Sequence, residues 1–203
     1  MNLRDLIFIK RKLKGGGPVL PDGYTKIKGI VCNNTCYYDT GLKAKGSDTI
    51  RTSFSVTGAC NVWGAYQSTS AENNYDLYAA TASGQKYLRY GDGTYPSSFG
   101  GNLNKRFDTV ITPTGTHGMP VDSEWEQLEF ESTRNFLIGS TSSTSTSPKM
   151  RGTFFGKFII EDANGYRFFG IPCVRESDEI VGYYDTVTES FFEPVGDNPT
   201  PLT

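Results

Sequence analysis

The chain has 203 residues, with 20 Lys and Arg against 22 Asp and Glu, and a formal net charge of −2. This near-neutral balance supplies no broad basic face, so nucleic acid is excluded as an expected partner. The chain contains 23 Gly, 12 Tyr and 13 Phe. Aromatic residues fit pleated sheets and glycine supplies tight turns, and no long window repeats apolar residues at helical spacing. Composition and length therefore predict one all-β domain.

Residues 1–19 are predicted to form an arm outside the domain. The apolar run Leu6–Ile9 is too short for a secretory core or a membrane span, so no membrane insertion is expected. The glycines at 15–17 would act as a flexible hinge. The arm is either unordered or an anchor that orders against a partner, since apolar residues are unusual in a solvated tail. Its candidate anchoring residues are Leu3, Leu6, Phe8, Lys10, Arg11, Lys12, Leu13 and Lys14.

Four cysteines occur, at positions 32, 36, 60 and 173. In an extended strand Cys32 and Cys36 would lie about 13 Å apart, so a disulfide between them would need a turn at Asn33–Asn34. We expect reduced, partly buried thiols, because free cysteine behaves as a small apolar residue. A zinc site is disfavoured, since His117 is the only histidine and no CxxC pair is present.

Beyond the arm the chain is expected to form successive strands. Residues 48–56 alternate, with Ile50, Thr52, Phe54 and Val56 on one face, which is typical of a half-buried strand. Further strands are expected at 62–66, 75–78, 87–91, 106–111 and 135–138, with a turn at 91–93. The polar run 140–147 is expected to be an exposed loop. A hairpin is expected over 154–174, because Asn164-Gly165 favours a tight turn, and Pro172 should lie at a strand end or edge.

Two pairs of segments at the ends of the chain carry a resemblance. They are Leu20–Tyr24 and Tyr38–Gly41 near the start, and Ile171–Val174 and Gly182–Asp185 near the end. This pattern resembles the concanavalin A-like lectin/glucanase (LamG-like) domains of phage and gut-bacterial surface proteins. The resemblance implies a two-sheet antiparallel jelly-roll sandwich over 20–196, in which the end segments pair side by side, followed by a tail at 197–203.

The acidic stretch 122–131 is the candidate for glycosidase chemistry. Glucanases of the resembling family carry alternating acids on one strand, and Glu124/Glu126 and Glu129/Glu131 imitate that spacing. The central aspartate of that pattern is absent here. We interpret the stretch as a strand with an acidic solvent face and an aromatic core face, and we expect no enzymatic activity. No Gly-x-Ser-x-Gly motif indicates a hydrolase triad.

Carbohydrate binding without catalysis is the better-supported chemistry. Sugars stack their apolar faces on aromatic rings and pair their hydroxyls with amides and carboxylates, and two loop-rich regions supply both. The candidate binding residues are Tyr66, Asn73, Asn74, Tyr75, Tyr78, Tyr90, Asp92 and Tyr95. No cofactor is expected, with calcium at Asn73, Asn74 and Asp76 as a weak alternative.

The resemblance leads to a hypothesis about function. We expect a non-catalytic structural or adhesive module, such as a bacteriophage head-decoration, fibre or tail-associated protein located in the virion. Its arm would dock on other virion proteins or on copies of the chain, making it oligomeric, and its sandwich would face a host glycan. The alternatives are a carbohydrate-binding domain of a bacterial surface protein and a laminarinase-like glucanase.

Overall fold

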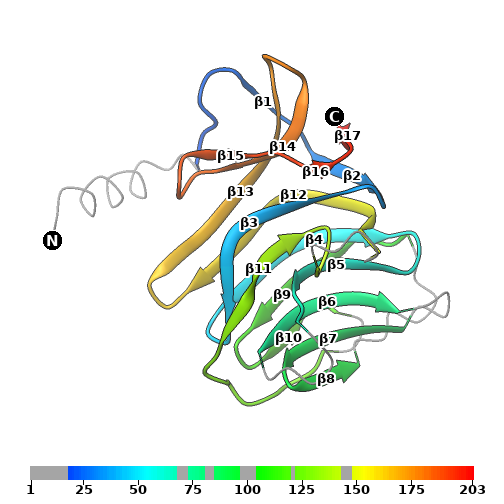
Figure 1. The fold of residues 1–203 in the computed structure, drawn as a ribbon, viewed down its shortest axis with the longest axis vertical. Helices are drawn as coiled ribbons and strands as arrows, with labels where there is room; N and C mark the ends of the chain where they lie inside the picture. The colour runs from blue at the N-terminus through cyan, green and yellow to red at the C-terminus, as the bar shows by residue number, and fades with distance from the viewer. Residues whose placement is uncertain (1–17, 68–72, 81–84, 97–103, 120–121, 143–147) are drawn as a thin grey trace, which may run out of the picture.

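The computed structural model describes residues 18–67, 73–80, 85–96, 104–119, 122–142 and 148–203. The predicted anchoring residues of the arm lie outside these ranges. Every element in the described ranges is a β-strand, and every pairing is antiparallel. Two sheets pack against each other as a sandwich, which confirms the predicted all-β architecture (Figure 1). Within the described ranges no helix could span a membrane.

The larger sheet has ten strands in the order β10-β9-β4-β12-β13-β14-β15, with β1, β2 and β17 attached beside this path. Its strands are β1 (Tyr24–Lys26), β2 (Gly29–Asn33), β4 (Thr49–Val56), β9 (Phe107–Thr112), β10 (Gly115–His117), β12 (Arg151–Asp162), β13 (Gly165–Arg175), β14 (Ile180–Asp185), β15 (Ser190–Phe192) and β17 (Thr200–Leu202). One side of β12 pairs with β4, and the other side pairs first with β2 and then with β13.

The smaller sheet has seven strands in the order β16-β3-β11-β5-β6-β7-β8. Its strands are β3 (Cys36–Lys45), β5 (Cys60–Ala65), β6 (Asn74–Ala80), β7 (Gln85–Gly91), β8 (Gly93–Pro96), β11 (Glu131–Ile138) and β16 (Val195–Gly196). The strands predicted at 48–56, 62–66, 75–78, 87–91, 106–111 and 135–138 each have a counterpart in one of the two sheets, and the chain turns at Gly91–Gly93 as expected.

The core lies between the sheets and is built from alternate residues of both. Ile50, Phe54 and Val56 of β4 are fully buried, as their period-two spacing predicts. They pack in one cluster with Trp63 and Phe136 of the smaller sheet. The Trp63 and Phe136 rings stack, with centroids 5.6 Å apart. The opposite face of each sheet is therefore its outer face.

The end segments of the chain come together in two different ways. β1 pairs with β13, which places Tyr24 opposite Arg175. Tyr38 and Tyr183, by contrast, belong to different sheets and meet across the core, with ring centroids 5.1 Å apart. The Tyr38 hydroxyl donates a hydrogen bond to the Val181 carbonyl at 3.2 Å. Strand pairing thus joins one pair of end segments, and packing between layers joins the other.

The sandwich extends past its predicted end at residue 196. Residues 197–203 were expected to be a tail, but β17 within them pairs with β2, with Pro201 opposite Ile30. The Lys28 amide also donates to the Leu202 carbonyl at 2.7 Å. The pairing partner β2 is about 170 residues away in sequence, so no local pattern in residues 197–203 predicts this strand.

The acidic stretch is not a strand, although its two faces are as expected. Trp125 and Phe130 pack against the core, while Glu124, Glu126 and Glu129 are exposed. Only an isolated bridge between Gly115 and Glu124 interrupts the irregular conformation before β11 begins. The segment passes from β10 in one sheet to β11 in the other. A chain crossing between the layers cannot stay in the hydrogen-bond ladder of either sheet, which is why the strand prediction is wrong.

The predicted hairpin is present as β12 and β13, with Asp162 opposite Gly165 across the turn. Gly165 has a φ of +121°. We therefore expect Gly165→Val to lower the free energy of unfolding by about 1–3 kcal/mol, because a β-branched residue resists this backbone conformation. Chemical denaturation measures the change. Ala163→Val in the same turn, where φ is not positive, is the control. Equal stability of the two variants would contradict the strain argument.

Pro172 lies in the interior of β13, and not at an end or edge as expected. Its carbonyl accepts a hydrogen bond from the Ile27 amide at 3.1 Å, so its nitrogen faces the same side of the strand. On that side pairing with β12 ends at Gly170 and pairing with β1 starts at Cys173. Pro172 has no N–H group to donate, and its nitrogen lies in the gap between the partner strands β12 and β1, where no donor is needed. The sequence around Pro172 does not show where these pairings end and begin.

All four cysteines are free and buried, which agrees with the expectation of reduced thiols. A turn at Asn34, with a φ of +67°, separates β2 from β3 and brings Cys32 and Cys36 together. Interaction with Cys36, followed by burial, raises the pKa of the Cys32 thiol well above its usual value.

Candidate functional site

The outer face of the seven-stranded sheet carries the polar side chains of the candidate site. Along β6 the residues alternate, so Tyr75 and Leu77 enter the core while Asn74, Asp76 and Tyr78 belong to the outer face. The same alternation along β7 turns Arg89 outward between core residues, directly opposite Asp76. Side chains from several strands thus gather on one surface.

A hollow of about 220 Å³ lies on this surface over β3 and β11. Its lining is mostly polar and combines a carboxylate, two cations, an amide and three hydroxyls with one apolar side chain. The lining residues are Asp39, Lys43, Thr133, Arg134, Asn135, Leu137, Thr141 and Ser142.

Two irregularities in the pairing of β3 with β11 shape the hollow. Leu137 pairs with Asp39 but Asn135 pairs with Lys43, so three residues of β3 face one residue of β11. Gly41 lies in this first bulge with a φ of +68°. Between Asn135 and Glu131 the extra residues are in β11 instead, so that three residues of β11 face one residue of β3. Bulges bend a strand and re-aim its side chains, and they are common next to functional sites.

Hydrogen bonds connect the polar groups within the hollow. The Asn135 amide donates to both carboxylate oxygens of Asp39, at 3.0 and 3.1 Å. Lys43 Nζ donates to Asn135 Oδ1 at 2.9 Å and to the Thr133 carbonyl at 2.8 Å. Asp39 Oδ1 also accepts from the Gly41 amide at 2.9 Å, which ties the carboxylate to the bulge. The three side chains are therefore held in place before any ligand arrives.

A cation–aromatic stack lies beside the hollow. The Arg89 guanidinium sits 3.7 Å from the Tyr66 ring centroid and 4.2 Å from that of Tyr78. Arg89 also donates to both oxygens of Asp76, at 2.9 and 2.5 Å. The Tyr66 amide donates to the carbonyl of Thr141, a residue of the hollow, at 2.9 Å. The stack and the hollow are thus parts of one continuous surface.

Asp76 is the most perturbed acid of this surface. Its carboxyl is fully buried, and burial raises its pKa to about 6 despite the opposing hydrogen bonds from Arg89. Because the folded pKa lies above the unfolded value near 3.8, this group favours the fold most below pH 3.8 and loses that contribution as pH rises to about 6. Perturbed acids concentrate at functional sites, although structural ion pairs produce them too.

Gly64 makes room for Asp76. A Cβ atom at Gly64 would lie 2.2 Å from the Asp76 Cβ atom and 2.4 Å from the Tyr75 carbonyl oxygen. The residue also has a φ of +134°. Only glycine therefore allows β5 to lie this close to β6 with the Asp76 side chain between them.

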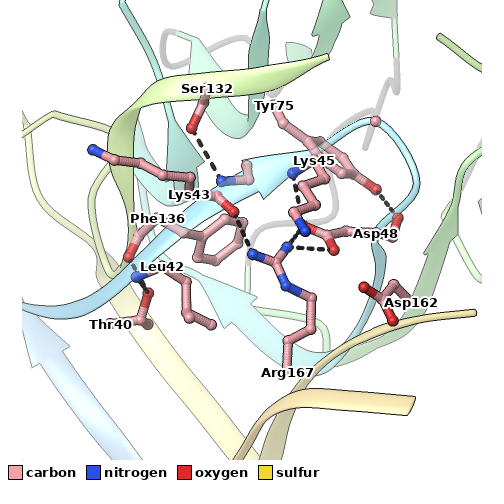
Figure 2. A network of polar contacts seen from close by, with 12 residues as sticks. Thr40, Leu42, Lys43, Lys45, Asp48, Tyr75, Ser132, Phe136, Asp162 and Arg167 are labelled. Atoms are coloured by element: carbon pink, nitrogen blue, oxygen red, sulfur yellow. Dashed lines mark hydrogen bonds and ion pairs between the residues drawn. The ribbon is translucent and has the colours of Figure 1, made fainter. Parts of the chain in front are cut away.

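A buried network behind the hollow links it to the other sheet (Figure 2). Arg167 Nη1 contacts both carboxylate oxygens of Asp48 at 2.6 Å, and Nη2 donates to the Lys43 carbonyl at 2.8 Å. The Lys45 amide donates to Asp48 Oδ2 at 2.8 Å, and the Tyr75 hydroxyl donates to the Asp48 carbonyl at 2.9 Å. Arg167 comes from β13 of the larger sheet and Lys43 from β3 of the smaller one, so the bond from Arg167 to the Lys43 carbonyl joins the layers, while the ion pair holds Arg167 against the β3–β4 turn.

The structure separates the predicted sugar-binding residues into two groups. Tyr66 and Tyr78 lie half-buried on the outer face beside the hollow, and Asp92 is exposed at the β7–β8 turn, while Asn74 belongs to the same face but is buried. Tyr75 and Tyr90 are fully buried in the core, and their hydroxyls donate to the carbonyls of Asp48 and Gly46. The prediction is wrong for these two tyrosines, because strand alternation sends them inward.

The other predicted residues have separate surroundings. Asn73 Nδ2 donates to the Glu131 carbonyl at 3.2 Å. Tyr95 belongs to β8, and its side chain lies outside the described atoms. The calcium alternative is not supported by the bonding, because Arg89 engages both Asp76 oxygens and Asn74 Oδ1 accepts from the Gln67 amide. Among the described side chains no group of three or more acids, histidines or cysteines could hold a metal ion.

Sequence reasoning missed the residues that define the hollow. Asp39 is noted above only as part of a fold pattern, and Lys43 and Asn135 are not singled out. Their grouping depends on the β3–β11 register and on two bulges. The available signal was weak: Gly41 lies within an otherwise strand-like run, and a glycine inside a strand often marks a bulge.

Comparisons with known proteins identify the fold. No family model and no curated protein matches the chain. A solved structure from Bacteroides ovatus ATCC 8483, named a "putative carbohydrate binding protein", superimposes with a TM-score of 0.60 at 13% identity. The match covers 88% of this chain and 61% of that one, so this chain spans about three fifths of the compared protein. At this identity the likeness shows the fold alone.

Proposed function

We propose that the chain is a non-catalytic carbohydrate-binding domain of a bacterial surface protein. The observation that carries this proposal is the preorganised group of Asp39, Lys43 and Asn135 in a hollow beside two tyrosines. A carboxylate and an amide side by side match neighbouring sugar hydroxyls, and binding costs less when such groups are already fixed. The half-buried Tyr66 and Tyr78 rings supply aromatic surface.

The comparison adds support of a different kind. A protein of the same fold carries a name that assigns carbohydrate binding to it. The virion hypothesis depends on the arm at residues 1–19, of which 1–17 lie outside the described residues. We therefore place sugar binding at a bacterial surface ahead of a virion role.

The binding experiment starts with a glycan array and continues with calorimetry on the strongest ligand. We expect Asn135→Ala to weaken binding about tenfold or more, because it removes hydrogen bonds to the sugar and releases Asp39 and Lys43. Glu176→Gln, an exposed change in the β13–β14 turn, is the control and should leave affinity unchanged. Unaltered binding by Asn135→Ala would exclude the hollow as the site.

We also expect no hydrolysis of the bound glycan. Glycosidases need two carboxyl groups flanking one bond, and among the described residues that line the hollow Asp39 is the only carboxylate. Asp76 on the same face is fully buried and engaged by Arg89. A reducing-end assay on the array ligands measures this. Turnover that is lost in Asp39→Asn would establish the glucanase alternative and reject the non-catalytic proposal.

A further inference from the structure

A second pocket lies at the edge of the ten-stranded sheet, where the β9–β10 hairpin meets the segment that leads to β11. Its volume is about 260 Å³. The lining residues are Thr112, Thr114, Gly115, His117, Glu124 and Trp125. His117, considered above only for zinc, and Glu124, considered above for glycosidase chemistry, thus meet in one place. The carbohydrate-binding role proposed for the hollow uses neither of them.

Hydrogen bonds hold the indole of Trp125 in this pocket. Its Nε1 donates to the Pro113 carbonyl at 2.9 Å, and its backbone amide donates to the Thr114 carbonyl at 3.0 Å. The ring also packs on Tyr90, with centroids 5.2 Å apart. A tryptophan fixed by its own hydrogen bond and by a core residue offers a rigid aromatic surface at little cost in conformational entropy.

The backbone on either side of the pocket is equally well defined. The Thr116 amide donates to the Ser123 carbonyl at 2.9 Å, and the Ser123 amide donates to Thr116 Oγ1 at 2.8 Å. A Cβ atom at Gly115 would lie 2.6 Å from the Ser123 carbonyl oxygen. Glycine therefore permits the close approach that brings Glu124 beside the hairpin.

We propose that this pocket binds a single neutral sugar residue, as a second carbohydrate site independent of the hollow. The fixed indole of Trp125 supplies a stacking surface, and the exposed Glu124 and His117 side chains supply an acceptor for hydroxyls and a second polar contact. Two threonine hydroxyls complete the polar lining. The carboxylate of Glu124 disfavours acidic sugars, and a volume just below the range of about 300–1,000 Å³ that is usual for small-molecule pockets limits the occupant to a small ligand such as one sugar ring.

Tryptophan fluorescence tests the proposal selectively. The sequence has two tryptophans, and Trp63 is fully buried in the core. A sugar can therefore protect only Trp125 from quenching by acrylamide. We expect glucose, galactose or mannose, titrated separately into the full chain, to reduce quenching in a saturable manner. The absence of protection by all three sugars would overturn the proposal.

Variants of exposed residues locate the effect. Glu124→Gln and His117→Ala should each weaken the protection about three- to tenfold, the expected loss of one or two hydrogen bonds. Asn135→Ala, in the hollow on the seven-stranded sheet, should leave the protection of Trp125 unchanged. If protection is unchanged in both pocket variants, neither Glu124 nor His117 contacts the sugar and the second site as proposed is rejected. Because Asn135→Ala acts only on the hollow, failure of the first proposal is distinguishable from failure of this one.

Discussion

Replacing Arg167 by methionine is expected to lower the free energy of unfolding by about 3–5 kcal/mol, because it leaves the buried carboxylate of Asp48 without its charged partner. The Asp48 side chain is fully buried in the β3–β4 turn, and Arg167 of β13 supplies its two 2.6 Å contacts (Figure 2). Urea denaturation at neutral pH measures the loss. An unchanged transition midpoint would show that the ion pair contributes nothing to stability.

The pH dependence of the same variant identifies the cause. Burial, opposed by Arg167, already raises the pKa of Asp48 in the folded protein. Removing Arg167 raises it further, and an acid whose folded pKa exceeds its unfolded value favours the fold only while protonated. The stability loss should therefore shrink as pH falls from about 7 towards about 4. The double variant Asp48→Asn/Arg167→Met should lose less than Arg167→Met, since no unpaired charge remains buried.

Gly64→Ala is expected to destabilise the chain by about 2–6 kcal/mol, as backbone strain and overpacking act together. The added Cβ would lie 2.2 Å from Asp76 Cβ. Because the clash separates β5 from β6 beneath the Arg89 stack, binding at the outer face should fall as well. Thermal or chemical unfolding measures the first effect, and calorimetry with the array ligand measures the second.

A matched control separates the clash from the backbone conformation. Gly23 has a φ of +87° but no atom within 4 Å of its Cβ position. Gly23→Ala should therefore cost only the strain, about 1–2 kcal/mol. A Gly64→Ala variant as stable as Gly23→Ala would mean that β5 and β6 can separate freely.

The sequence predicted those parts of the fold that local patterns determine. Alternation identified β4, and Asn164-Gly165 identified the β12–β13 turn, because both signals operate within a few residues. β17 and the interior position of Pro172 were missed. Each depends on a pairing partner far along the chain, namely β2 for β17 and β1 for Pro172.

The site was less predictable for the same physical reason. Tyr66 and Tyr78 do lie on the outer face, but composition could not tell Tyr78 on that face from Tyr75 in the core. One residue of register decides between them. Asp39 and Asn135 lie 96 residues apart, and only the bulged pairing of β3 with β11 brings them together.

A crystal structure of the chain with the strongest array ligand tests the central claim most directly. The account predicts a sugar ring in the hollow, with hydroxyls within hydrogen-bond distance of Asp39 and Asn135 and contact with Tyr66 or Tyr78. A glycan bound away from the outer face of the seven-stranded sheet, or an array on which no glycan binds, would contradict it.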